Sequence, residues 1–386
     1  MTCHNCRSES RKFGKRQNRQ RYQCQQCRKV FTDARDNNLD GMCLPPTFSG
    51  LPSRRRYPGN VKELPKVELH LHLDCSLSFA AVARLDESVS LEEYQREFIA
   101  PRRCTSLADF LTGAPRGFQL MQEEAALALV VEDLFEQLAA DGVIYAEIRF
   151  APLLHLERGL TPEQVVAAVD RATEASIRSS GIQARLILCT LRHFDCEKSL
   201  VTAGLVERFR GSRVAALDIA GDEAGYPIDA HIPAFRYAIE HGLHRTAHAG
   251  EARGPDSVWE TLREFQPARI GHGVRSIEDP ALVQHLIRRC IHLEVCPTSN
   301  LQTGIKQDFA EHAVDELYRA GVPLSINTDT RTITNITLTE EYRNLEEHFG
   351  WTEDDLATCN QAAIAAAFIE DSTKEELRSR LLANKV

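Results

Sequence analysis

Two histidines and an aspartate alternate with leucines in residues 67–74, which read Val-Glu-Leu-His-Leu-His-Leu-Asp. Side chains alternate between the two faces of a β-strand, so His70, His72 and Asp74 point to one face and the leucines to the other. A lone buried histidine is usually a hydrogen-bonded core residue, but two on one inward face are costly to bury without a charge or a metal ion. The pattern therefore predicts a strand that offers two imidazoles to one metal ion.

Three later segments place further groups of this kind at the ends of apolar stretches. They are Thr-Ala-His-Ala-Gly-Glu with His248 and Glu251, Arg-Ile-Gly-His-Gly with His272, and Ser-Ile-Asn-Thr-Asp with Asp329. Zinc accepts imidazole nitrogen and carboxylate oxygen as ligands, and iron and manganese accept them too. Zinc with an open coordination position lowers the pKa of bound water from about 15.7 toward about 7. These residue types therefore indicate metal-assisted hydrolysis.

Short apolar segments alternate with longer amphipathic ones from Val67 onward, which predicts alternating strands and helices. Strands are expected at residues 67–73, 143–150, 183–191, 214–219, 243–247, 269–271, 291–295 and 323–327. Helices are expected at residues 122–140, 162–179, 197–209, 232–241, 280–289 and 309–320, with the helices after Leu338 packed outside or forming a C-terminal cap. Eight strands separated by helices favour the α/β class and a (β/α)8 TIM-type barrel with extra helices.

Catalytic groups of such barrels gather at the C-terminal ends of the strands, where the polar residues above are expected. Taken in this order, the segments resemble the adenosine deaminase family. The resemblance also includes Pro-Lys-x-Glu-Leu-His-x-His-Leu-Asp at 65–74, Asp-Ile-Ala-Gly-Asp-Glu at 218–223 and Cys-Pro-Thr-Ser-Asn at 296–300, and it covers the chain from about Val61 to the C-terminus. It implies zinc-dependent hydrolytic deamination of adenosine and 2′-deoxyadenosine to the 6-oxopurine nucleoside and ammonia.

The resemblance also implies a role for each matching residue. One catalytic Zn²⁺ per chain would be held by His70, His72, His248 and Asp329. Glu251 would give a proton to the purine ring, and His272 would orient or deprotonate the metal-bound water. The implied substrate-binding residues are His72, Asp74 near the ribose, Gly221 against the purine edge, and Thr330. The alternatives are a supporting hydrogen-bond role for Glu251 and a helix-capping role for His272.

Two positions depart from the family pattern. Thr330 stands where the family normally has an aspartate that hydrogen-bonds N7 of the purine, and Cys75 replaces the usual glycine. A threonine hydroxyl can still donate to N7, but loss of one good hydrogen bond at the transition state costs roughly 1–3 kcal/mol, or about 5- to 150-fold in rate. The predicted reaction class does not depend on these two positions, whereas the identity of the substrate does.

Asp74 favours a nucleoside over free adenine, because the adenine-acting members carry glutamate at this place. A 5′-modified adenosine, aminodeoxyfutalosine or adenine remains an alternative substrate. A nucleoside-binding protein without turnover is an alternative of another class, and so is a protein that acts on a polymer adenine. Leu107, Phe110 and Leu111 resemble the family's apolar lid over the ribose, and simple helix packing is the other interpretation.

The N-terminal arm, residues 1–31, carries Cys3-x2-Cys6 and Cys24-x2-Cys27, the spacing of a four-cysteine zinc site. Residues 19–31 resemble the zinc ribbon of certain insertion-sequence transposases. We therefore expect a second, structural Zn²⁺, with residues 32–60 as a linker rich in turn-forming residues and residues 61–386 as the barrel. A structural knuckle without a partner is the alternative to weak nucleic-acid contact.

The composition is that of a globular protein, with 43% hydrophobic and 26% charged residues. Residues 1–57 hold 13 Lys and Arg against 4 Asp and Glu, whereas the rest holds 33 against 51. The basic arm can thus attract polyanions that the acidic body repels. No apolar stretch approaches the roughly 20 residues of a membrane span, and the N-terminus is polar. We therefore expect a cytoplasmic protein with a small purine nucleoside as its partner and no membrane contact.

The nucleic-acid interpretation of the arm can be tested directly. Contacts to phosphate release counterions, so the affinity of the arm for DNA or RNA must fall steeply as the salt concentration rises. Filter binding to both polymers across a salt series measures this dependence. Absence of binding at low salt would leave only the structural interpretation.

Overall fold

The computed structural model describes residues 10–16, 19–24, 30–32 and 61–383. The chain divides into two compact units, Met1–Pro46 and Thr47–Val386. In the first unit, an antiparallel sheet has the order β1 (Ser10–Arg16), β2 (Arg19–Cys24), β3 (Val30–Thr32). Cys3, Cys6 and Cys27 lie outside the described residues, as do the side chain of Cys24 and residues 33–60. The second zinc site and the linker therefore stay predictions.

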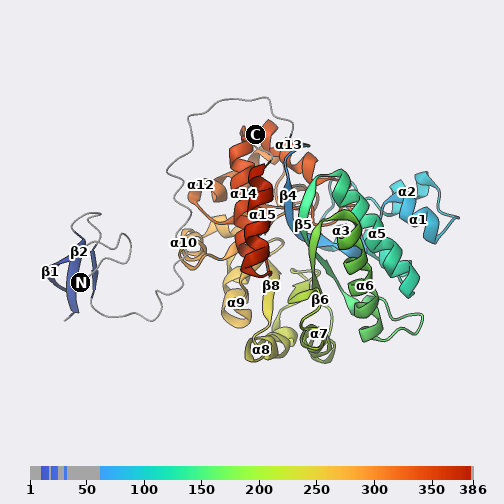
Figure 1. Ribbon diagram of the computed structural model, residues 1–386, viewed down its shortest axis with the longest axis horizontal. Coiled ribbons are helices and arrows are strands. Elements are labelled where there is room, and N and C mark those ends of the chain that lie inside the picture. Colours follow the sequence, from blue (N-terminus) through green and yellow to red (C-terminus); the bar gives the residue numbers. More distant parts are fainter. Residues whose placement is uncertain (1–9, 17–18, 25–29, 33–60, 384–386) are drawn as a thin grey trace. The chain divides into compact units, whose positions relative to one another are not determined.

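The described part of the second unit is an eight-stranded barrel with helices around it (Figure 1). The strands follow one another in chain order, and neighbouring strands from β4 to β11 pair in parallel. This confirms the predicted (β/α)8 barrel. The strands are β4 (Lys66–His72), β5 (Val143–Phe150), β6 (Gln183–Leu191), β7 (Val214–Ala220), β8 (His244–Ala249), β9 (Arg269–His272), β10 (His292–Val295) and β11 (Leu324–Ile326).

The first and last strands close the barrel through a few contacts around the loop after β11. Leu71 forms an isolated parallel bridge with Asp329. The backbone N–H of His72 donates to the carbonyl of Asp329 at 2.8 Å, and the N–H of Asp329 donates to the carbonyl of His70 at 3.0 Å. The side-chain oxygen of Asn327 also accepts from the N–H of His70, at 3.1 Å. The closure therefore holds the end of β4 against Asp329.

Helices cover the outside of the barrel, as the amphipathic segments predict. Those between the strands are α5 (Glu124–Ala140), α6 (Pro162–Ser180), α7 (Cys196–Arg208), α8 (Ile232–Glu240), α9 (Pro255–Phe265), α10 (Pro280–Arg289), α11 (Pro297–Gln302) and α12 (Val314–Ala320). The segment between β4 and α5 adds α1 (Phe79–Leu85), α2 (Leu91–Glu97), α3 (Leu107–Phe110) and α4 (Ala114–Gln119). The C-terminal helices are α13 (Leu338–Phe349), α14 (Glu353–Ala366) and α15 (Asp371–Ala383).

Local sequence explains where these helices begin and end. Thr161 and Gln164 form a reciprocal capping box at the start of α6, with Pro162 in its first turn, and Gly181 ends the helix in the left-handed conformation. The C-terminal helices α14 and α15 pack against the first two strands through an apolar cluster that includes Leu69 and Tyr145. Among the described helices, none combines the length and apolar character of a membrane span.

The expected helix at residues 309–320 is wrong in its first half. The structure has a short 3-10 turn at Phe309–Glu311, and α12 begins only at Val314. The chain between them is extended at His312, where ψ is 134°. The ring Nδ1 of His312 accepts a hydrogen bond from the backbone N–H of Val314 at 3.1 Å. In a continuous helix the N–H of Val314 would donate to a backbone carbonyl. Because it donates to the ring of His312 instead, the helix begins only at Val314.

Candidate active site

Imidazole and carboxylate groups from separate strands meet at the C-terminal end of the barrel. One ligand-type atom of each of His70, His248, His272 and Asp329 lies within 4.8 Å of the others, and all four residues are buried. His72 lies beside them, with its Nε2 3.2 Å from Nε2 of His248 and 3.5 Å from Oδ1 of Asp329. The structure thus places the four expected metal ligands and His272 together.

The environment of His70 fits a cation in this cluster. Nδ1 of His70 lies 2.9 Å from Oε2 of the buried Glu294, so the carboxylate accepts the Nδ1 proton and Nε2 carries a lone pair. Among the described residues, Nε2 has no hydrogen-bond partner. It lies 3.3 Å from Oδ1 of Asp329, another electron-rich atom. A divalent metal ion between these two atoms would bind both of them, and this donor set suits zinc.

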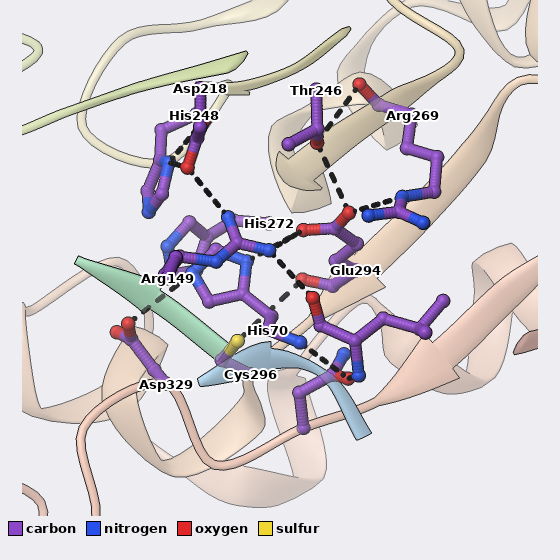
Figure 2. A network of polar contacts seen from close by, with 12 residues as sticks. His70, Arg149, Asp218, Thr246, His248, Arg269, His272, Glu294, Cys296 and Asp329 are labelled. Atoms are coloured by element: carbon purple, nitrogen blue, oxygen red, sulfur yellow. Dashed lines mark hydrogen bonds and ion pairs between the residues drawn. The ribbon is translucent and has the colours of Figure 1, made fainter. Parts of the chain in front are cut away.

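Two of the clustered histidines are oriented by carboxylates that share one arginine. Nδ1 of His248 lies 3.1 Å from the carboxylate of Asp218, just as His70 contacts Glu294. Arg149 donates from Nη1 to Asp218 at 2.8 Å and from Nη2 to Glu294 at 2.6 Å. Figure 2 shows the guanidinium between the two carboxylates. Each carboxylate accepts an Nδ1 proton, which leaves the Nε2 atoms for the ion.

Burial and charge compete at the shared carboxylates. Burial alone would raise the pKa of Glu294, but the guanidinium groups of Arg149 and Arg269 hold it well below its usual range. Nε of Arg269 donates to Glu294 at 2.6 Å. Burial acts in the same way on Asp218, where His248 and Arg149 lower the pKa. Both groups therefore stay ionised and can orient the imidazoles.

The backbone at two site residues is in the left-handed region, with φ of 60° at His272 and 65° at Asp329. Non-glycine residues in this region cost roughly 1–3 kcal/mol and concentrate at functional sites. A glycine beside them serves close packing: a Cβ on Gly271 would lie 2.9 Å from Cε1 of His70 and 3.3 Å from Cα of His248. Gly271 thus leaves room for the two rings, whose centroids are 4.4 Å apart.

Glu251 lies beside this cluster and is buried. Its Oε1 accepts from Nδ2 of Asn300 at 3.3 Å, and its Oε2 lies 3.5 Å from Nε2 of His272. Burial raises the pKa of Glu251 well above its usual range, and the charge of Asp329 raises it further. The side chain can therefore hold a proton near neutral pH, which general-acid catalysis requires.

Glu223 fixes the loop that carries Glu251. Its carboxylate accepts from the backbone N–H of Gly250 at 2.7 Å, of Glu251 at 3.0 Å and of Arg253 at 2.8 Å. It also accepts from the hydroxyl of Ser257 at 2.6 Å. Because these bonds fix the turn after β8, the position of the Glu251 side chain relative to His248 is defined before a ligand binds.

The three remaining substrate-binding candidates lie at the ends of different strands. Asp74 follows β4 and is buried, and its Oδ2 accepts from the N–H of Ala151 at 3.2 Å, while burial raises its pKa to about 6. Gly221 follows β7 with a φ of 99°. Thr330 follows Asp329, and in the described part of the chain its buried hydroxyl has no hydrogen-bond partner.

The lid candidates form a small apolar cluster of their own. Leu107 and Phe110 pack with Cys104 and Ile333, and Leu111, Cys75 and Ala252 are at its edge. Cys75 and Ala252 directly follow Asp74 and Glu251 in the chain. The helical segment between β4 and α5 therefore packs against the loops that carry the candidate substrate-binding and acid groups.

Several residues that support the site have no role in the predictions from the sequence. Asp218, Glu223 and Asn300 lie in motifs of the family resemblance that assign them no role, and Arg149 and Glu294 lie outside those motifs. The available signal for Glu294 and Arg149 is a charged side chain within a strand, but β5 also holds Glu147 and β10 also holds His292. For Asn300 the signal is its place in the motif at 296–300, which does not reveal its partners 28 and 49 positions away.

A barrel with imidazoles, carboxylates and a buried acid gathered at its strand ends has the construction of a metal-dependent hydrolase. The model of the adenosine deaminase family matches residues 65–384, and the chain belongs to this family. This confirms the resemblance seen in the sequence.

Individual relatives agree with that assignment. The chain is 33% identical to an adenosine deaminase of Clostridium acetobutylicum over 333 residues, covering 83% of this chain and 99% of the relative. It is 37% identical to adenosine deaminase 1 of Streptomyces coelicolor over 360 residues, covering 87% and 89%. The crystal structure of an adenine deaminase from Arthrobacter aurescens matches with a TM-score of 0.77 and 27% identity, covering 83% and 98%.

We expect Asp218→Asn to lower the affinity for Zn²⁺ by about 10- to 100-fold, because the variant loses the ionised partner of His248 and of Arg149. Competition with a chelator of known affinity measures the change. Asp170→Asn is the matched control, since Asp170 on α6 also pairs with an arginine, Arg213, at 2.8 Å. Equal affinities of the two variants would contradict the orienting role of Asp218.

Proposed function

We propose that this chain hydrolyses adenosine and 2′-deoxyadenosine to the corresponding 6-oxopurine nucleosides and ammonia, using Zn²⁺ held by His70, His72, His248 and Asp329. One observation supports this most strongly. The buried carboxyl of Glu251, which has a raised pKa, lies within reach of a cluster whose donor set suits a metal ion. A general acid beside a cation site is what attack of water on an aromatic amidine carbon needs.

The ion, when bound, would make hydroxide available near neutral pH and stabilise negative charge on oxygen. The protein residues supply the rest. Glu251 donates its proton to N1 of the purine as the oxygen of water forms a bond to C6, so that negative charge does not accumulate on the ring. His272 orients the attacking oxygen. The hydroxyl proton of the adduct then passes to the amino group, the C6–N bond breaks to release ammonia, and the ring becomes a 6-oxopurine. The proton that the water lost on becoming hydroxide restores the acid form of Glu251.

The remaining candidate residues would position the nucleoside. The unpartnered hydroxyl of Thr330 is a donor for a ring nitrogen such as N7. Gly221, without a side chain, lets the purine edge approach the backbone at the end of β7. Asp74 would accept from a ribose hydroxyl once it is ionised. The names of the two bacterial relatives favour adenosine, at 33% and 37% identity.

Free adenine is the second candidate, because the Arthrobacter aurescens structure that matches this fold is an adenine deaminase. A 5′-modified adenosine or aminodeoxyfutalosine would share the purine contacts and differ only beyond the ribose. These candidates differ in the groups that Asp74 and the lid cluster would contact, so a set of substrates separates them.

We expect the purified chain to deaminate adenosine and 2′-deoxyadenosine with kcat/KM in the range of about 10⁴–10⁸ M⁻¹s⁻¹ that is typical of enzymes on their own substrates. The measurement is the absorbance change of the purine over adenine, adenosine, 2′-deoxyadenosine and 5′-modified adenosines, with metal content determined on the same sample. A clear preference for adenine would reassign the substrate. No ammonia from any of them would leave the binding-protein and polymer-adenine alternatives.

Glu251→Gln should keep its metal and lose about 10²- to 10⁴-fold in kcat, because an amide cannot supply the proton that N1 needs. Steady-state kinetics and metal analysis of one preparation test this. Glu260→Gln is the control: Glu260 on α9 pairs with Arg253 at 3.2 Å and should leave kcat unchanged. Wild-type activity in Glu251→Gln would refute the role of Glu251 as proton donor.

A further inference from the structure

Asn300 on α11 lies between the two residues that the proposed function makes catalytic. Its Nδ2 is 2.9 Å from Nδ1 of His272 and 3.3 Å from Oε1 of Glu251. Asn300 is fully buried. An amide NH₂ has two protons and accepts nothing, so both bonds run outward from Asn300. Nδ1 of His272 and Oε1 of Glu251 are therefore both acceptors.

The orientation of this amide is set by a backbone group. The N–H of Val314 donates to Nδ1 of His312 at 3.1 Å, and a backbone N–H can only donate. Burial lowers the pKa of His312 to about 3, so its ring is neutral and its one proton is on Nε2. That nitrogen lies 3.3 Å from Oδ1 of Asn300. The amide oxygen thus faces His312, and the NH₂ group faces the candidate site.

We propose that His312 and Asn300 are positioning residues that place the proton of His272 on Nε2 and the acid proton of Glu251 on Oε2. The catalytic roles of His272 and Glu251 rest on the proposed function. The directions of the hydrogen bonds do not depend on it. The two atoms that it assigns as donors lie 3.5 Å apart. Both protons are thereby directed away from Asn300.

This assignment decides between the two roles that the sequence left open for His272. A neutral imidazole with its proton on Nε2 can donate a hydrogen bond from that atom and cannot take a proton there. His272 therefore orients an oxygen and stabilises negative charge on it, instead of acting as the base. Glu251, for its part, presents its proton from the oxygen that is not held by the amide.

The short helix α11 connects this arrangement to the metal-ligand candidates. Ser299, the residue before Asn300, donates from its hydroxyl to Oδ2 of Asp329 at 2.7 Å. Neighbouring residues on one turn thus contact Asp329, His272 and Glu251. A displacement of this turn would disturb all three together.

Nitrogen NMR tests the proposal without using activity. In the Zn²⁺-loaded chain with ¹⁵N-labelled histidine, long-range ¹H–¹⁵N correlations distinguish a protonated ring nitrogen from an unprotonated one. The signals of His272 are identified by their loss in His272→Gln. We expect a neutral ring with the proton on Nε2. A proton on Nδ1, or on both nitrogens, overturns the proposal.

Variants of Asn300 and His312 add a kinetic test. Asn300→Asp replaces the donor with an acceptor, so the proton of His272 should move to Nδ1 and kcat should fall by about 10²- to 10⁴-fold, the range expected when an essential imidazole has the wrong tautomer. KM should change far less than kcat, because substrate binding is not the affected step. His312→Phe should lower kcat in the same direction, and His312→Gln, which keeps a donor toward Asn300, should recover part of it.

His155→Phe is the control for replacing a buried, hydrogen-bonded imidazole with a phenyl ring, since His155 is fully buried and bonds to the carbonyl of Met121. It should lower thermal stability and leave kcat and the His272 signals unchanged. If His272 keeps its wild-type tautomer in Asn300→Asp, or if this variant keeps the wild-type kcat, the positioning role of Asn300 and His312 is refuted. A wild-type chain that releases no ammonia refutes the proposed function instead, and the NMR result on His272 stands separately.

Discussion

The guanidinium of Arg149 is the charge on which the arrangement of the site depends. It is buried inside the barrel, and burying a cation costs several kcal/mol unless its partners are well placed. Asp218 and Glu294 accept from it at 2.8 and 2.6 Å, and each of them also contacts a clustered histidine. The charges that stabilise one another in the barrel interior are therefore the same ones that orient His248 and His70.

The candidate site has two halves that are held in different ways. The metal half is built on strands β4, β8 and the loop after β11, and buried ion pairs between strands fix it. The acid half is built on loops, where Glu223 accepts three backbone N–H groups around Glu251 and Asn300 contacts both Glu251 and His272. Because rigid strands and well-bonded loops meet there, neither half has to be ordered by the substrate.

The sequence alone predicted the barrel well because each strand is a local pattern. The alternation in residues 67–74 directs His70 and His72 to one face whatever the rest of the chain does. Ion pairs across the barrel are not a local pattern. Arg149 and Glu294 are 145 positions apart, and the sequence of neither strand indicates that the other contains its partner. The break at His312 is likewise not visible in the local pattern, since the apolar periodicity of 309–320 gives no hint that a side chain accepts the N–H of Val314.

The identity of the ion's ligands is the central claim, and anomalous diffraction from crystals of the Zn²⁺-loaded chain, recorded on both sides of the zinc edge, tests it most directly. We expect one strong peak at the C-terminal end of the barrel, about 2.0–2.2 Å from nitrogen atoms of His70, His72 and His248 and an oxygen of Asp329. We also expect His272 to lie outside the coordination sphere. A peak ligated by His272 in place of His72, or no peak at this cluster, would refute this set of ligands.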